Sequence, residues 1–72
     1  DKQAAIADYN QAIKFNPNFA YAYHRRGLTY DVLGNKSQAI SDLHQAVKIY
    51  QEKGGNEEWL KKAQDIIGEL QQ

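Results

Sequence analysis

The feature that most constrains this chain is an internal repeat with a period of 34 residues. Residues 2–15 align with residues 36–49, and ten of these fourteen positions match in identity or in apolar character. The identical pairs are Lys2/Lys36, Ala5/Ala39, Ile6/Ile40, Asp8/Asp42, Gln11/Gln45, Ala12/Ala46 and Lys14/Lys48. A unit this short cannot bury an apolar face alone, so the repeat predicts stacked supersecondary units that share one core.

Each copy has the apolar period of an amphipathic helix. Residues 5, 6, 9, 12 and 13 form one stripe at helical spacing, and the second copy repeats it with one further position. Those stripes consist of Ala5, Ile6, Tyr9, Ala12 and Ile13, and of Ala39, Ile40, Leu43, Ala46, Val47 and Tyr50. The paired alanines predict that a neighbouring helix approaches each copy closely.

Turn residues divide the rest of the chain into two more helices. Asn16-Pro17-Asn18 ends the first helix, and Asn18 is expected to cap a second one from Phe19 to Leu33. Gly34 is expected to end that helix in the left-handed conformation. The second copy then extends to about Glu52 before the Gly54-Gly55 break.

A fourth helix is predicted after Asn56, which is expected to cap it. Its apolar residues are Trp59, Leu60, Ala63, Ile66, Ile67 and Leu70. Glu57 with Lys61 and Glu58 with Lys62 are expected to pair on its outer side. The sequence therefore predicts an all-α fold of four helices joined by short turns.

The period and the residues at particular positions resemble those of the tetratricopeptide repeat family over residues 1–53. The matching residues are Tyr23, Gly27 and Tyr30 on the first helix of a repeat, Ala39, Leu43 and Ala46 on its second helix, and Ala5, Tyr9, Ala12 and Pro17 on the earlier second helix. Two residues depart from the pattern: Arg26 stands where the family usually has Leu, and Gln51 stands where it has Pro.

The resemblance implies a short right-handed solenoid of antiparallel helix pairs. Residues 1–17 would be the second helix of a partial repeat, 18–53 one complete repeat, and 54–72 a C-terminal capping helix. Gly27 costs about 1 kcal/mol relative to Ala in the middle of a helix. Close packing against Ala39 or Ala46 is the expected compensation, and Trp59 is expected to lie in the core beneath the last repeat.

Composition excludes several classes of function. Nine basic and nine acidic residues give a net charge of zero, which argues against nucleic-acid binding, and no helix has the basic polar face of a membrane-surface helix. There is no Cys, no phosphate-binding loop, no metal-ligand spacing and no nucleophile motif. We expect no catalysis, metal or cofactor, and His44 is expected to be a solvated surface residue. The sequence contains no signal or membrane-spanning segment, so the cytoplasm is the default expectation.

The helix from Phe19 to Leu33 has a second face, opposite Tyr23, Gly27 and Tyr30. It consists of Tyr21, His24, Arg25, Leu28, Asp31 and Val32. The resemblance implies that this face lines a concave groove holding a partner peptide or helix, with Arg25 suited to a carboxylate. Two other interpretations stay open: Leu28 and Val32 can pack against first helices of adjacent repeats, and His24 and Arg25 can be ordinary solvated side chains.

Two alternative roles also stay open at this stage. The N-terminal helix has no preceding partner in this sequence, so its stripe of Ile6, Tyr9 and Ile13 is expected to be partly exposed. Such a stripe favours self-association, through a homodimer or through exchange of helices. The segment can also be a non-catalytic arm of a larger enzyme, which depends on sequence outside it.

Overall fold

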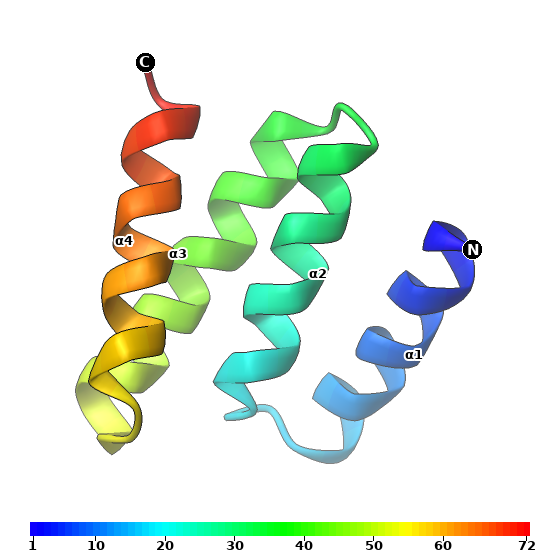
Figure 1. Ribbon diagram of the computed structural model, residues 1–72. Helices are drawn as coiled ribbons and strands as arrows, with labels where there is room; N and C mark the ends of the chain where they lie inside the picture. The colour runs from blue at the N-terminus through cyan, green and yellow to red at the C-terminus, as the bar shows by residue number, and fades with distance from the viewer.

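The chain folds into four α-helices and no strand. The computed structural model describes all 72 residues. It contains α1 (Lys2–Phe15), α2 (Ala20–Val32), α3 (Lys36–Lys53) and α4 (Glu57–Leu70). α2 packs against α1 on one side and α3 on the other, and α4 packs against α3 (Figure 1). The predicted all-α helical-repeat architecture is confirmed. None of the four helices combines the length and apolar character needed to cross a membrane.

Gly34 and Asn56 act at their helix ends as predicted, and Asn35 provides a further cap that was not predicted. Asn35 caps α3, and the Asn56 side chain accepts hydrogen bonds from the amides of Glu58 and Trp59 at the start of α4. Gly34 adopts φ 84°, and its amide and that of Asn35 donate to carbonyls of the last turn of α2. Gly34 therefore closes α2 in the left-handed conformation that favours glycine.

The predicted cap at the start of α2 is wrong. Phe19 is the N-cap residue, and it makes no side-chain capping hydrogen bond. The Asn18 amide instead donates to the Asn16 side chain at 3.1 Å, which folds residues 16–18 into a turn. This local hydrogen bond sets the direction of the chain after α1, and it leaves α2 to begin without a polar cap.

The core lies where α2, α3 and α4 meet, and small residues allow these helices to approach closely. Leu43, Ala39, Ala46 and Ala63 are fully buried. A Cβ atom on Gly27 would lie 3.1 Å from the Ala39 carbonyl oxygen and 3.1 Å from Leu43 Cγ. The expected close packing of Gly27 against Ala39 is confirmed, and it explains why a glycine stands in the middle of α2.

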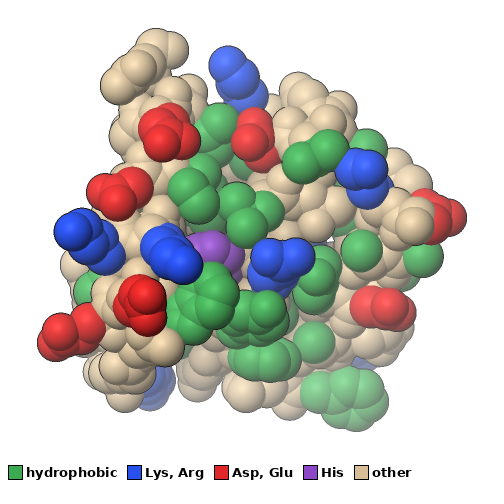
Figure 2. Space-filling model, in the orientation of Figure 1, with side chains coloured by type: hydrophobic (Ala, Val, Ile, Leu, Met, Phe, Trp, Pro, Cys, Tyr) green, Lys and Arg blue, Asp and Glu red, His purple; other side chains and the backbone are tan.

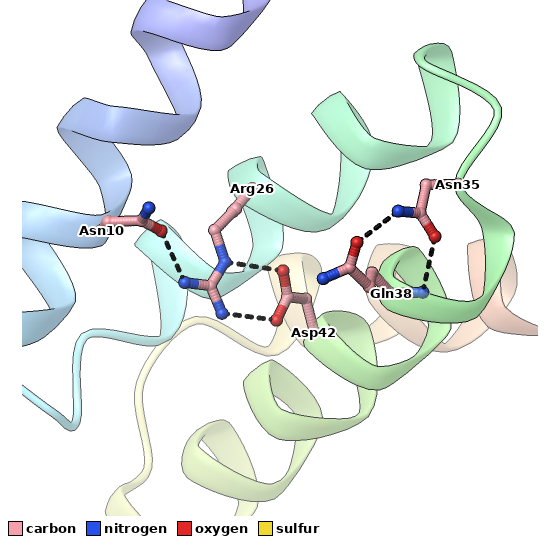
Figure 3. Close-up of polar contacts among 5 residues, drawn as sticks. All are labelled: Asn10, Arg26, Asn35, Gln38 and Asp42. Atoms are coloured by element: carbon pink, nitrogen blue, oxygen red, sulfur yellow. Dashed lines mark hydrogen bonds and ion pairs between the residues drawn. The ribbon is translucent and has the colours of Figure 1, made fainter.

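Arg26, which replaces the usual Leu, ties three helices together. Its guanidinium donates to both carboxylate oxygens of Asp42 on α3, at 2.8 and 2.7 Å, and to Asn10 Oδ1 on α1 at 2.8 Å (Figure 3). The hydrogen bond to Asp42 is the main reason that the pKa of Arg26 is raised. The bidentate and largely buried Arg26–Asp42 pair joins α2 to α3, and the hydrogen bond to Asn10 attaches α1 to them.

Candidate functional site

Five of the six residues predicted on the partner-facing side of α2 lie at the surface. Tyr21 is 41% exposed and Val32 is 67% exposed. Arg25 is exposed as well, and Leu28 and Asp31 are half-buried. In Figure 1, α2 lies between α1 and α4, and Figure 2 shows hydrophobic and basic side chains gathered near the centre of this view. The arrangement leaves a mixed apolar and cationic strip open on α2.

His24 does not belong to that exposed strip. Its side chain is only 1% exposed, so it is neither a solvated residue nor an open contact, and both expectations for it are wrong. Trp59 of α4 packs over it, with the two ring centroids 5.3 Å apart at an interplanar angle of 82°. Trp59 on the apolar side of α4 therefore packs against α2 at His24. Helical spacing alone could not show that His24 would be the α2 residue in this contact.

The environment of His24 keeps the imidazole neutral. Burial lowers its pKa most, and the nearby positive charges of Arg25 and Lys62 lower it further. The Nδ1 atom is buried and has no hydrogen-bond partner. The side chain is therefore a poor proton donor at neutral pH, and no carboxylate or nucleophile is paired with it.

Trp59 and Lys62 of α4 extend the surface of α2, and sequence reasoning missed this. Trp59 is half-buried rather than enclosed in the core, and its ring lies 5.4 Å from that of Tyr21 in an edge-to-face arrangement. The Lys62 ammonium lies 5.1 Å from the centre of the Trp59 ring. The Glu57–Lys61 and Glu58–Lys62 pairs expected on α4 do not form, and Arg26–Asp42 is the one ion pair in the structure. The spacing of Trp59 and Lys62 on one helical face was the signal available.

Arg25 of α2 lies near both α1 and the buried His24. The neighbouring Tyr9 hydroxyl is the main reason that the pKa of Arg25 is raised. Arg25 is nevertheless exposed and has no carboxylate partner within ion-pair distance. The set of Tyr21, Arg25, Trp59 and Lys62, called the α2–α4 face below, offers aromatic surface and two cations. These groups suit non-covalent binding, and no cluster of three His, Asp or Glu side chains is placed to hold a metal ion.

The repeat signature and the fold together agree with the comparison to known families. A profile described as TPR repeat matches residues 3–34, and one described as Tetratricopeptide repeat matches residues 20–53. Together they span more than half of the chain. The chain belongs to the tetratricopeptide repeat family. Tetratricopeptide repeats generally mediate interactions between proteins.

Two curated relatives carry similar segments. TPR repeat-containing thioredoxin TDX of Arabidopsis thaliana is 44% identical over 46 residues, which are 64% of this chain and 12% of that protein. Tetratricopeptide repeat protein 36 of Danio rerio is 39% identical over 54 residues, which are 75% of this chain and 29% of that protein. The chain thus spans less than a third of the length of either relative. No solved structure is a significant match to it.

Proposed function

We propose that this chain is a non-catalytic recognition module that binds a partner peptide or helix through the exposed side of α2. The observation that carries the proposal is the strip formed by Tyr21, Arg25, Leu28, Asp31 and Val32. It combines exposed apolar area with an exposed guanidinium, whereas Ala22, His24 and Gly27 of the same helix are buried. Exposed aromatic and arginine side chains on a rigid element are the groups that dominate binding energy at protein interfaces.

The helical array supports this role by holding the strip rigidly. α2 is packed on both sides, by α1 and α3, and Arg26 links all three helices through Asp42 and Asn10. Because these helices are ordered before binding, little conformational entropy is lost when a partner docks. We propose the division given above for the same chain: a partial repeat over 1–17, a complete repeat over 18–53, and a capping helix over 54–72.

A capture experiment tests the proposal. The immobilised domain is compared with an Arg25→Ala/Val32→Ala variant and with a His44→Ala/Lys48→Ala control on the exposed side of α3. All three proteins should have equal helical content by circular dichroism, because every substituted side chain is exposed. A partner retained by the parent and the control, and lost by the first variant, supports the proposal. Equal capture by all three proteins, or no specific capture at all, contradicts it.

A second candidate function is self-association through α1. The buried α3 residues Ala39, Leu43 and Ala46 have Ala5, Tyr9 and Ala12 as their repeat equivalents on α1. These three α1 residues are only half-buried, as is Ile13, whereas Ile6 is already covered by the fold. Sedimentation over a wide concentration range tests this role. A mass that rises with concentration supports it, and a constant monomer mass rules it out.

A further inference from the structure

His24 on α2 lies beneath Trp59 of α4 in a contact that has no place for a charge. The His24 side chain is 1% exposed, and its ring centroid lies 5.3 Å from that of Trp59. Its Nδ1 atom is buried and has no hydrogen-bond partner. An imidazolium carries an N–H on both ring nitrogens, so protonation places a donor on Nδ1 where no acceptor is available. The contact between α2 and α4 therefore requires a neutral His24.

The groups at this junction of helices strengthen that requirement. Burial lowers the pKa of His24 most, and the positive charges of Arg25 on α2 and Lys62 on α4 lower it further. Tyr21 of α2 and Tyr50 of α3 contribute phenol groups, which carry no charge at neutral pH. No carboxylate forms an ion pair with His24. A proton on His24 therefore meets two like charges and no opposite charge.

α4 is held to the rest of the domain in two places that differ in chemistry. Ile67 packs with Leu43 of α3 in an apolar cluster that contains no titratable group. Nearer the N-terminus of α4, Trp59 contacts α2 at His24. The linker before this end of α4 is loosely packed, since a Cβ added at Gly54 would meet nothing within 4 Å. The N-terminal end of α4 can therefore move while its contact with α3 stays in place.

We propose that protonation of His24 releases the Trp59 end of α4 from α2, while Ile67 keeps α4 anchored to α3. The released form takes up a proton that the closed form excludes, so acid favours release. In the closed form the rings of Trp59 and Tyr21 lie 5.4 Å apart, edge to face, and release removes Trp59 from the α2–α4 face. Release itself is independent of the proposed function. Its effect, that a partner held beside Tyr21 loses part of its contact surface on acidification, rests on that function.

Amide hydrogen exchange followed by NMR tests the release without a partner. Amides 60–64 of α4 are compared with those of α3 around Leu43, in the parent, in His24→Gln and in the matched control His44→Gln, which replaces the exposed second histidine. In the released form the imidazole has its ordinary pKa of 6.5, so lowering the pH from about 7.5 to about 5.5 should raise the release equilibrium roughly tenfold. After correction for the intrinsic pH dependence of exchange, we expect the α4 amides to be less protected than the α3 amides. Their protection should fall about tenfold on acidification in the parent and in His44→Gln, and stay constant in His24→Gln.

Trp59→Ala is a second variant that tests the inference even if His24→Gln does not fold. Trp59 is half-buried, and its removal uncovers His24. We expect α4 exchange in Trp59→Ala to lose its pH dependence, and the pKa of His24, read from its imidazole proton shifts, to rise toward 6.5.

Two results overturn the inference. Equal protection of the α4 and α3 amides in the parent means that α4 opens only when the whole domain unfolds. A pH dependence of α4 exchange that is absent from the parent, or that persists in His24→Gln or Trp59→Ala, means that His24 does not control the release. Either result leaves the proposed function standing, because no partner is involved. If the capture experiment finds no partner, the release stands and only its effect on binding is lost.

Discussion

Gly27 and Gly68 make a matched pair that tests how tightly the helices are packed. Both lie inside helices, so replacement by alanine stabilises the helix itself by about 0.5–1 kcal/mol in each case. Their surroundings differ. A Cβ on Gly68 meets nothing within 4 Å, whereas a Cβ on Gly27 meets a backbone oxygen of Ala39 and Leu43 Cγ at 3.1 Å and Asp42 Cβ at 3.2 Å.

The two substitutions should therefore change stability in opposite directions. The contacts at Gly27 are a few tenths of an ångström too short, and one of them is to backbone, so α2 and α3 must move apart. Overpacking of this kind costs about 1–3 kcal/mol, which exceeds the gain in helix propensity. We expect Gly27→Ala to lose about 1–2 kcal/mol. Gly68→Ala should gain about 0.5 kcal/mol, because it lies near the end of α4, where helices fray.

Urea unfolding followed by far-ultraviolet circular dichroism measures both free energies, and thermal unfolding provides a check. For a domain of this size, 1 kcal/mol corresponds to a shift in Tm of about 4–8 °C. Gly27→Leu, which adds a larger side chain at the same contact, should abolish the cooperative transition. If Gly27→Ala stabilises the protein as much as Gly68→Ala does, the close approach of α2 and α3 is not what requires a glycine here.

Three further predictions concern polar groups. Asp42→Ala should cost about 2 kcal/mol because it leaves the Arg26 guanidinium half-buried and unpaired, and Arg26→Leu/Asp42→Ala should recover part of that loss in a double-mutant cycle. Because burial holds the pKa of His24 below 6.5, the unfolded chain takes up a proton that the folded chain does not, so the free energy of unfolding should fall as the pH drops below about 6.5. His24→Gln should flatten that dependence in pH-dependent urea melts, and an unchanged slope would refute it. Asn56→Ala should cost about 1 kcal/mol and speed amide exchange in α4, whereas Asn18→Ala should do neither, since Asn18 caps no helix.

The helices and their order follow from local sequence. The apolar period of 3.6 residues and the turn residues around Pro17, Gly34 and Gly54 are short-range signals, which depend on residues within about two helical turns, and the repeat shows the same pattern twice. Gly27 predicted one long-range contact, with the helix that packs against it, because a glycine in the middle of a helix needs a compensating contact. The Asn18 cap failed because Asn16 accepts a hydrogen bond from the Asn18 amide and forms a turn, and α2 then begins with Phe19 at the N-cap position.

Only part of the candidate site could be predicted from the sequence. Helical spacing placed Tyr21, Arg25 and Val32 on one side of α2, and the structure finds all three exposed. Helical spacing could not show that α4 would lie beside that face, with Trp59 covering His24. Whether a residue on the second face of a helix is exposed depends on how many neighbours pack there, and that number is set by a helix about 35 residues further along the chain.

The sequence by itself determined the family, the four helices and the apolar stripe of each helix, because periodicity and turn chemistry act over a few residues. Only the tertiary structure decided which polar groups became partners. Arg26, Asp42 and Asn10 come from three helices, and His24, Trp59 and Lys62 come from two. Such contacts depend on the distance and angle between packed helices, which arise from the summed fit of many side chains and are not encoded at any single position.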